Sequence, residues 1–597
     1  MHAFSVWAPA ARRVELDLGP DRPCLPMTAG AGGWWHVEVP DAGHGTDYGF
    51  RLDGGEPLPD PRSAWQPQGV HGPSRVFDAG RHRWSDGAWP GRDVLGAVFY
   101  ELHVGTFTPA GTLDAAVGHL DHLSALGVDV VELMPVAAMP GRWGWGYDGV
   151  ALYAVHEPYG GPAALQRFVD ACHARGMAVC LDVVYNHLGP EGNYLPRFGP
   201  YFTDRRSTPW GEAVNLDAEG SASVRRFLCD NALRWFADFH VDCLRLDAVH
   251  ALADESCPHL LAQLSEETAS LARRLGRRLS LVVESDLNDP RVIEPTASGG
   301  LGMTAQWSDD FHHALHALLT GERQGYYVDF GSPQVLARTL TQVFRHAGDH
   351  STFRGRQWGR PVDPARHRGH RFLGYAQSHD QVGNRAAGDR LGALVGPDRL
   401  AAAAALVLTS PFTPMLFMGE EWGATTPFQF FSDFGDPVVA GAVREGRRQE
   451  FRSHGWSAEV PDPQDPATRQ AGVLDWSQPG HGVHARLLRW YTQLIALRRA
   501  EPDLREDDLS RVEVGLGDGW LSVRRGAFDL AVNLSDRPVA VPARPGRVVL
   551  GWGEVQPRPD GVARLAPGAT ALLSTSAGTW QDRPVARSRG AAARLDA

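Results

Sequence analysis

Short apolar segments of strand-like composition alternate with helical segments through the central part of the chain, and this alternation limits the fold more than any other feature. Eight apolar segments can be recognised, at 97–104, 128–134, 178–184, 241–246, 279–283, 303–307, 372–376 and 415–418. Between them, the segments 113–126 and 163–174 carry apolar residues at helical spacing. Strands and helices that alternate on this scale form a parallel sheet, and eight strands close into a (β/α)8 or TIM barrel.

The segments that flank this region have a different pattern. They consist of short runs of alternating apolar and polar residues, separated by clusters of Gly, Pro and Asp, which is typical of antiparallel sheets. We therefore predict an α/β protein with an N-terminal β-sandwich at 1–92, a (β/α)8 barrel at 93–504 and a C-terminal β-sandwich at 505–577. Residues 578–597, which are rich in Arg and Ala, are predicted to be disordered.

The composition excludes several classes of function. The 70 acidic and 58 basic residues are spread along the chain, so we expect neither a nucleic acid nor a membrane as partner. The sequence contains no lysine, which excludes a lysine Schiff base and a Walker-type phosphate loop. The six cysteines form no CxxC pair, and residues 1–16 lack the continuous apolar run of a signal peptide, so a cytoplasmic protein is expected. The oligomeric state stays open.

Four of the predicted strands run directly into polar clusters. These clusters are Asp-Val-Val-Tyr-Asn-His at 182–187, Arg-Leu-Asp at 245–247, Glu-Ser-Asp at 284–286 and Ser-His-Asp at 378–380. In a (β/α)8 barrel the catalytic groups lie at the C-terminal ends of the strands, so the four clusters are expected to converge on one pocket.

Two carboxyl groups in these clusters are suited to opposite tasks. Arg245 and Asp247 lie on the same face of an extended chain, so the guanidinium can hold the Asp247 carboxylate ionised, as a nucleophile requires. Glu284 ends the next strand, where the charges of Asp247 and Asp380 would raise its pKa and keep it protonated as a general acid. Cleavage of a glycosidic bond with retention needs such a pair, roughly 5 to 5.5 Å apart.

Each cluster taken alone has a simpler explanation, because acidic residues after a strand often cap the following helix. Four clusters in register on consecutive βα modules fit a shared site better. Within that site, Asp380 with His187 and His379 is expected to hold sugar hydroxyls and to stabilise an oxocarbenium-like transition state.

The four clusters, in this order, resemble the four signature regions of the α-amylase family of glycoside hydrolases, and the resemblance covers nearly the whole chain. It implies that Asp247 is the nucleophile, Glu284 the acid and base, and Asp380 the stabiliser of the transition state. It also implies sugar contacts from Arg245, His187, His379 and Tyr147, the last in the segment Gly-Trp-Gly-Tyr-Asp at 144–148. Two departures, Cys243 in place of the usual Gly and Ser378 in place of Asn, replace no catalytic group.

Asn186 raises the question of a metal. It resembles the asparagine that ligates calcium in many α-amylases, but the sequence offers no assignable set of further oxygen ligands. A solvated or sugar-facing Asn186 is favoured, and neither a metal nor a cofactor is expected.

Further stretches narrow the resemblance. Residues 4–11 are similar to the start of the N-terminal domain shared by branching enzymes, isoamylases and trehalohydrolases, and 100–109, 284–290 and 306–313 are similar to the trehalohydrolase branch. This implies hydrolysis of the α-1,4 bond that joins a maltooligosaccharide to a terminal trehalose, so that maltooligosyl trehalose is the substrate. Substrate contacts near the leaving group are then expected from His250, Asp309, Asp310 and His312, and Trp307 is expected to offer an aromatic face to a sugar ring. Hydrogen bonding at a helix start explains the pair His312 and His313 equally well.

Three other functions are weighed against this one. A glycogen branching enzyme would share the fold and the carboxylates but would transfer the glycosyl unit to a glucan 6-hydroxyl. A non-catalytic glucan-binding protein of this fold would not need intact Asp247, Glu284 and Asp380. A metal-dependent hydrolase would use histidines such as His187, His312 and His313, but a cation at Arg245 would compete with the metal.

Overall fold

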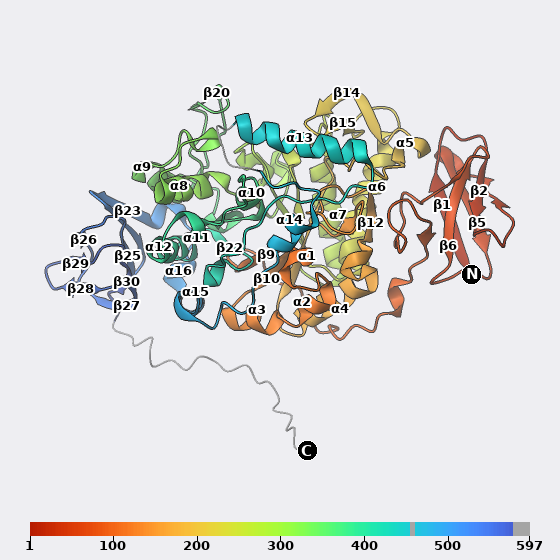
Figure 1. Cartoon of the computed structure of the whole chain (residues 1–597). Helices are drawn as coiled ribbons and strands as arrows, with labels where there is room; N and C mark the ends of the chain where they lie inside the picture. Colours follow the sequence, from red (N-terminus) through yellow and green to blue (C-terminus); the bar gives the residue numbers. More distant parts are fainter. Residues whose placement is uncertain (454–459, 577–597) are drawn as a thin grey trace, which may run out of the picture. The chain divides into compact units, whose positions relative to one another are not determined.

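The computed structural model describes residues 1–453 and 460–576 (Figure 1). The chain forms two compact units, Met1–Ser510 and a second that begins at Arg511. The predicted disordered tail, 578–597, lies outside the described residues. Among the helices of the described ranges, none has the length and hydropathy that a membrane span needs.

Eight parallel strands form a closed barrel in the first unit, which confirms the predicted fold. In the order in which they pair, they are β9 (Phe99–Leu102), β10 (Val130–Leu133), β13 (Ala178–Val183), β16 (Cys243–Leu246), β17 (Ser280–Val283), β18 (Ala305–Trp307), β21 (Phe372–Tyr375) and β22 (Thr413–Phe417). Each lies within or overlaps one of the eight predicted segments. Pairing of Met415 in β22 with Phe99 in β9 closes the ring.

Helices connect the strands and surround the barrel (Figure 1). The principal ones are α4 (Gly161–His173), α6 (Ser221–Asp238), α7 (Leu260–Leu275), α8 (Asp309–Thr320), α12 (Pro397–Leu408) and α15 (Gly482–Ala500). The helix predicted at 113–126 is divided into α2 (Leu113–Val117) and α3 (Leu120–Leu126). The break falls at Gly118, whose N–H bonds the carbonyls of Ala115 and Ala116 and so tightens the end of α2.

The interior of the barrel changes from apolar to polar along the strands. Side chains alternate in direction, so Phe99, Val130, Cys180 and Cys243 share one apolar core inside the barrel. Two residues further along their strands, Glu101, Glu132, Asp182 and Arg245 are also buried, each with 3% or less of its surface exposed. The polar layer therefore lies toward the C-terminal ends of the strands, where the predicted site begins.

The N-terminal residues form two antiparallel sheets, as predicted. One contains β1 (His2–Trp7), β5 (Trp34–Val39) and β4 (Thr28–Ala29), and the other β3 (Leu25–Pro26), β2 (Val14–Asp17), β6 (Asp47–Leu52), β7 (Pro57–Leu58) and β8 (Ser74–Arg75). Trp7 packs edge-on against Tyr201, with ring centroids 5.3 Å apart, so the sheets and the barrel belong to one compact unit. The boundary at residue 92 stays a prediction.

The second unit is also a two-sheet β structure, as predicted. Its larger sheet contains β23 (Val512–Gly517), β24 (Trp520–Arg525), β25 (Phe528–Asn533), β30 (Thr570–Ser574) and β27 (Arg547–Trp552). Its smaller sheet contains β26 (Val539–Pro542), β29 (Val562–Leu565) and β28 (Val555–Arg558). Small apolar side chains such as Ala531, Val541 and Ala563 form the core between the sheets.

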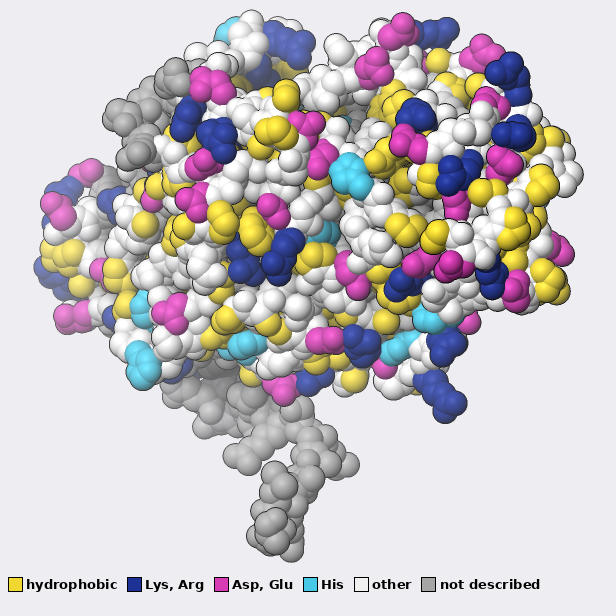
Figure 2. Space-filling model, turned by 45° about the vertical axis from the view of Figure 1, so that its right-hand side comes forward, with side chains coloured by type: hydrophobic (Ala, Val, Ile, Leu, Met, Phe, Trp, Pro, Cys, Tyr) yellow, Lys and Arg dark blue, Asp and Glu magenta, His cyan; other side chains and the backbone are white. Residues whose placement is uncertain are grey.

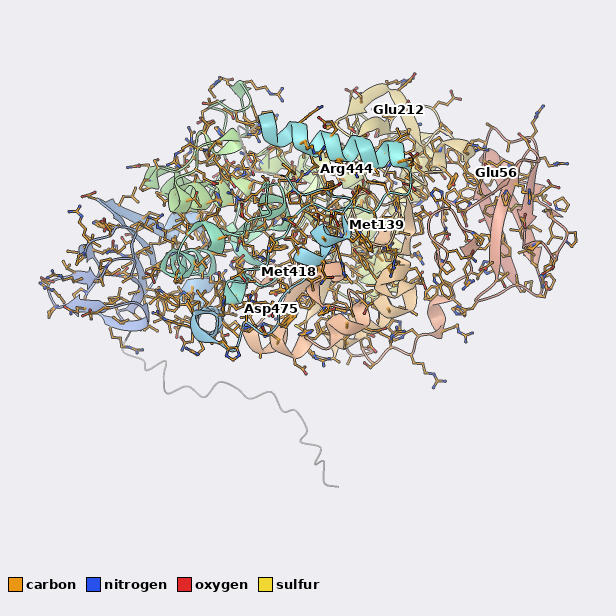
Figure 3. The ribbon with its side chains drawn as sticks, viewed as in Figure 1. Glu56, Met139, Glu212, Met418, Arg444 and Asp475 are labelled. Carbon is orange, nitrogen blue, oxygen red and sulfur yellow. The ribbon has the colours of Figure 1, made fainter. Side chains whose placement is uncertain are left out.

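The surface carries charges of both signs. On the face shown in Figure 2, acidic and basic side chains are interspersed among polar and apolar ones, with no continuous patch of one sign. In Figure 3 the four labelled charged side chains, Glu56, Glu212, Arg444 and Asp475, lie apart from one another in the first unit. This face offers no extended basic surface of the kind that binds a nucleic-acid backbone.

Candidate active site

Arg245 is the centre of the polar layer. It leaves β16 with its side chain fully buried, and its Nη1 donates to both carboxylate oxygens of Asp182, at 3.0 and 2.8 Å, and to Oδ1 of Asp247 at 2.6 Å. Its guanidinium carbon lies 4.5 Å from the centroid of the Trp307 ring. A buried cation fixed in this way holds two carboxylates from neighbouring strands in defined positions.

Asp247 is held as a carboxylate. Besides Arg245, the side-chain nitrogen of Asn186 donates to Asp247 Oδ2 at 2.9 Å. Burial acts to raise the pKa of Asp247, but the charge of Arg245 and the hydrogen bond from Asn186 outweigh it and lower the pKa below its ordinary value. Asp247 is therefore ionised at neutral pH. Asn186, which the sequence placed toward solvent or sugar, contacts this carboxylate instead.

Glu284 has the opposite ionisation. Its pKa is raised well above the ordinary value, mainly by burial and also by the charges of Asp247, Asp309 and Asp380, against the lowering effect of Arg245. Its Oε2 lies 3.8 Å from Nη2 of Arg245 and accepts a hydrogen bond from the N–H of Ala248 at 2.7 Å. A protonated carboxyl and a carboxylate thus face the two terminal nitrogens of one guanidinium, which is the pairing that glycoside hydrolysis needs.

The backbone after Asp247 is shaped to reach Glu284. Ala248 adopts a left-handed conformation, with φ of 40°, which an alanine enters only at a cost of about 1 kcal/mol. The Ala248 N–H donates to the Glu284 carboxyl, and the turn that this conformation makes brings the N–H of Val249 to the Glu284 carbonyl at 3.0 Å. The two carboxyl-bearing strands are therefore fixed to each other by backbone as well as by Arg245.

Tyr147 and His379 form a stacked pair beside Asp182. The Tyr147 hydroxyl lies 2.7 Å from Asp182 Oδ2 and 2.8 Å from Nε2 of His379, and the two rings stack with centroids 5.1 Å apart. Burial would lower the pKa of His379, but the charges of Glu101 and Asp380 raise it to about 9. Tyr147 and His379 are thus brought to the site as predicted.

His187 and Asp380 complete the predicted set at this position. Nε2 of His187 contacts the Tyr147 carbonyl at 3.0 Å. Asp380 is the second residue of α10 (His379–Gly383), and its side chain is 43% exposed, with Oδ1 3.5 Å from Nε2 of His379. An accessible carboxylate next to buried, hydrogen-bonded neighbours is free to receive sugar hydroxyls.

A tryptophan that the sequence did not single out lies beside His187. Trp210, at the turn between β14 (Phe202–Thr208) and β15 (Gly211–Val214), stacks on the His187 ring with centroids 4.7 Å apart and is 48% exposed. Sugar rings bind well to such exposed aromatic faces. The residue carries no motif, so only the spatial neighbourhood of His187 could have identified it.

His250 and Asp309 border the site next to Glu284. Nδ1 of His250 accepts from the N–H of Asp286 at 3.3 Å. The Asp309 carboxyl bonds the hydroxyl of Tyr375, and burial raises the pKa of Asp309 to about 7. Trp307 lies beneath the guanidinium of Arg245, with 3% of its surface exposed, so the structure places it under the site rather than at its surface.

Asp310 and His312 point into the protein instead. Oδ2 of Asp310 accepts from the backbone N–H groups of Arg345 and His346, at 2.6 and 3.0 Å, and from Nδ2 of Asn288 at 2.9 Å. His312 contacts the Ala376 carbonyl at 2.9 Å. Both side chains are buried and satisfied by protein groups, in agreement with the hydrogen-bonding explanation considered for His312.

Replacing Asp310 with Ala should destabilise the first unit by about 3 kcal/mol, because buried N–H donors would lose their charged acceptor. Urea-induced unfolding followed by tryptophan fluorescence measures this effect. The exposed Asp204 provides the matched control, and Asp204→Ala should change the midpoint little. Equal midpoints for the two variants would contradict the anchoring role of Asp310.

A second hairpin borders the loop that follows Glu284. It contains β19 (His350–Ser351) and β20 (Arg356–Gln357), and its Arg354 forms an ion pair with Asp286. The Trp358 indole donates to the Asp286 carbonyl at 2.7 Å, while Phe353 at the tip is 50% exposed. In Figure 1 this hairpin, α13 (Pro437–Ser453) and the β14–β15 hairpin lie along one edge of the first unit.

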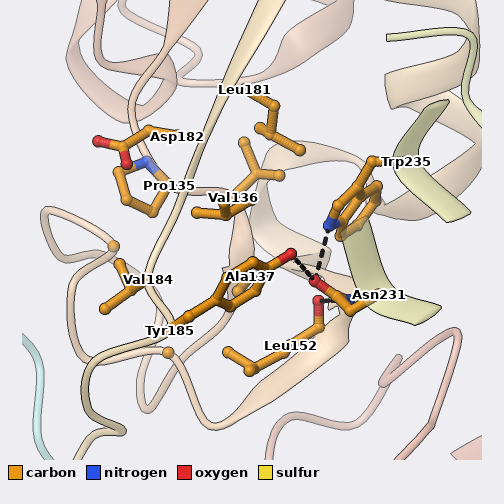
Figure 4. Close-up of a pocket in the computed structure, with 13 residues that line it drawn as sticks. Pro135, Val136, Ala137, Leu152, Leu181, Asp182, Val184, Tyr185, Asn231 and Trp235 are labelled. Atoms are coloured by element: carbon orange, nitrogen blue, oxygen red, sulfur yellow. Dashed lines mark hydrogen bonds between the residues drawn. The ribbon is translucent and has the colours of Figure 1, made fainter. Parts of the chain in front are cut away.

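A small cavity lies behind β13 and is not part of this site. Figure 4 shows it lined by Leu181 from β13 and Trp235 from α6, with mainly apolar surroundings. The Tyr185 hydroxyl and the Trp235 indole both donate to Oδ1 of Asn231, at 2.7 and 3.1 Å. These contacts support the outer side of the strand whose inner side carries Asp182.

A closed parallel barrel with an ionised and a protonated carboxyl on one arginine has the architecture of a retaining glycosidase. Comparison with known proteins agrees. The family "Alpha amylase, catalytic domain" matches residues 75–203, and "Carbohydrate-binding module 48 (Isoamylase N-terminal domain)" matches residues 2–65.

Relatives of known name extend over nearly the whole chain. A malto-oligosyltrehalose trehalohydrolase of Arthrobacter ramosus is 54% identical over 569 residues, covering 95% of this chain and 98% of the relative. One from Rhizobium sp. (strain M-11) is 50% identical over 579 residues, covering 96% and 97%. A crystal structure from Salmonella typhimurium, provisionally titled an alpha amylase, has a TM-score of 0.88 at 38% identity and covers 96% of this chain and 97% of that one. The chain therefore belongs to the malto-oligosyltrehalose trehalohydrolases of the α-amylase family of glycoside hydrolases.

Proposed function

We propose that this protein hydrolyses the α-1,4 bond next to the terminal trehalose of maltooligosyl trehalose and releases trehalose and a maltooligosaccharide. The observation that carries the proposal is the pair of carboxyl groups on Arg245, with Asp247 ionised and Glu284 protonated. The choice of substrate is supported by the names of relatives that are 50% and 54% identical to the chain.

In the first step, the Asp247 carboxylate attacks the anomeric carbon while Glu284 donates its proton to the glycosidic oxygen. The carbon–oxygen bond to trehalose breaks, and a covalent glycosyl ester forms on Asp247. In the second step, the Glu284 carboxylate accepts a proton from water, whose oxygen attacks the same carbon and releases the maltooligosaccharide. Two inversions give net retention, and both carboxyl groups return to their starting states.

The remaining side chains divide between the two sides of the bond. On the nucleophile side, we assign contacts with the reacting sugar to Tyr147, His187, His379 and Asp380, with Arg245 as the group that holds Asp247. On the leaving-group side, we assign trehalose contacts to His250 and Asp309, which flank Glu284. Trp307, Asp310 and His312, expected from the sequence to bind substrate, are assigned supporting roles because their side chains are buried under or behind the pocket.

We infer a cytoplasmic location from the use of cysteine. Cys172, Cys180, Cys229 and Cys243 are free and buried in the described part of the chain, as thiols of a protein from a reducing compartment commonly are.

Product analysis tests the proposed function. The purified protein is incubated with maltotriosyl trehalose and, separately, with maltopentaose, each with and without EDTA. We expect free trehalose and maltotriose from the first substrate, little change in the second, and no effect of EDTA. Proton NMR at early times should detect the α-anomer of maltotriose first, because the configuration is retained.

Two outcomes would contradict the proposal. Breakdown of maltopentaose with survival of the trehalosyl bond would indicate another α-glucan hydrolase. New α-1,6 linkages in longer glucans would indicate a branching enzyme. A 1,4-alpha-glucan branching enzyme of Leifsonia xyli is 33% identical to this chain over 350 residues.

A further inference from the structure

The hydrogen bonds around Tyr147 determine where its proton lies. The two carboxylate oxygens of Asp182 accept from Arg245, and the pKa of Asp182, raised to about 6 by burial against the charge of Arg245, leaves it ionised at neutral pH. The Tyr147 hydroxyl has one proton, which it donates to Asp182 at 2.7 Å. Its oxygen can then only accept from His379, 2.8 Å away, so Nε2 of His379 carries a hydrogen.

The other ring nitrogen of His379 faces Glu101 on β9. The Glu101 carboxyl is 1% exposed, and both of its oxygens are used by His379: Oε1 contacts Nδ1, and Oε2 accepts the backbone N–H at 2.9 Å. A carboxylate in this position requires a hydrogen on Nδ1 as well. Two donating ring nitrogens make the imidazole a cation.

We propose that Glu101 is a positioning residue that keeps His379 as an imidazolium and, through that cation, orients Tyr147 and Asp380 for the reaction. The consequence for catalysis rests on the proposed function, whereas the charge on His379 does not. The Ser-His-Asp motif that contains His379 indicates neither the positioning role of Glu101 nor the charge on His379, because Glu101 lies on the first strand of the barrel.

Charged and titratable groups from every neighbouring element act on His379. Four lie on barrel strands: Glu101 on β9, Glu132 on β10, Asp182 on β13 and Arg245 on β16. The others are Asp380 on α10, His103 directly before α1 (Val104–Phe107), and Tyr147 in the loop before β12 (Ala151–Val155). Carboxyl groups predominate in this set. Burial opposes the cation, but Glu101 and Asp380 raise the pKa of His379 to about 9.

The chain offers a matched pair of variants. In Glu101→Gln the amide can donate to Nδ1 and accept the backbone N–H, so both contacts survive with a neutral ring and only the charge is lost. Glu132 pairs with Glu101 in the register of β10 and β9 and is equally buried, but burial raises its pKa well above the ordinary value. Glu132→Gln therefore removes no charge and serves as the control.

The first test needs no substrate. The full-length protein is labelled with 13C at histidine Cε1, and the His379 resonance is identified by its loss in His379→Asn. We expect it to titrate near pH 9 in the wild type and in Glu132→Gln, and to be neutral at pH 7.5 in Glu101→Gln. A neutral His379 in the wild type, equal titration in Glu101→Gln, or an equal fall in Glu132→Gln would overturn the proposal.

The second test measures binding of maltotriosyl trehalose by calorimetry in Glu284→Gln, where position 284 cannot titrate. Affinity should fall as pH rises through about 9, the pKa of His379, because the cation is lost. Addition of Glu101→Gln should weaken binding about tenfold at pH 7.5, the effect of one charge-assisted contact, and remove the change near pH 9. An unchanged pH profile would refute the positioning role. Failure to bind this sugar at any pH, with the NMR titration as expected, would refute the proposed substrate and leave the charge assignment intact.

Discussion

Replacement of Glu284 with Gln is expected to lower kcat for maltotriosyl trehalose by about 10³-fold, because the leaving oxygen loses its proton donor. The pKa of Glu284 is raised chiefly by burial, so the wild-type group is protonated at neutral pH. Activity of the wild type should therefore fall as pH rises through that raised pKa. It should also fall at low pH, where Asp247, whose pKa is lowered, gains a proton. In Glu284→Gln the high-pH limb due to Glu284 should disappear.

A substrate with a good leaving group separates proton donation from other effects. α-Maltotriosyl fluoride needs no proton from Glu284 to leave, so the first step should proceed in Glu284→Gln with a burst of fluoride. Glu294→Gln is the matched control, because Glu294 forms its ion pairs with Arg366 and His367 outside the site and its loss should leave kcat nearly unchanged. Equal loss of activity toward the fluoride and the natural sugar would argue that Glu284 does not act as the acid.

The architecture could be predicted because it depends on local patterns of apolar residues. The period of two in the strands and the apolar spacing of the helices are short-range properties, and each of the eight predicted segments contains or overlaps a barrel strand. The break between α2 and α3 was not predicted, because a single glycine such as Gly118 can lie inside a helix. Only its backbone hydrogen bonds show that α2 ends there. Element ends of this kind depend on capping contacts that spacing does not reveal.

The position of a site residue could be predicted where the residue directly follows a barrel strand. It could not be predicted where the position depends on contacts with residues distant in the sequence. Asp247 and Glu284 are placed by their strands, so their positions follow once the barrel is assumed. Asp310 lies one residue after Asp309 on α8, yet only the first borders the pocket, because the helix turns the second toward residues 345 and 346. Trp210 lies on the β14–β15 hairpin beside His187, and Phe353 lies at the tip of the β19–β20 hairpin, in segments where the sequence has no motif.

Replacement of Asp247 should be the more damaging of the two carboxyl changes. Asp247→Asn removes the nucleophile and leaves an amide that cannot form the glycosyl ester, so kcat should fall by about 10⁴-fold or more. The loss of its negative charge should also lower the pKa of Glu284 from its raised value, although burial continues to hold it above the ordinary one. Asp182→Asn is the comparison. It also removes a carboxylate that pairs with Arg245, but this carboxylate does not attack the sugar, so the loss of activity should be smaller.

The identity of the nucleophile can be tested by chemical rescue. Asp247→Gly leaves space beside Arg245 for a small anion, and azide added with α-maltotriosyl fluoride should attack the anomeric carbon from the face that Asp247 uses. The product should be the β-maltotriosyl azide, formed with a single inversion, and no azide product should arise with Asp182→Gly. Rescue by azide in Asp182→Gly, or an α-azide from Asp247→Gly, would mean that another group attacks the sugar, because only removal of the true nucleophile opens that face to an external anion.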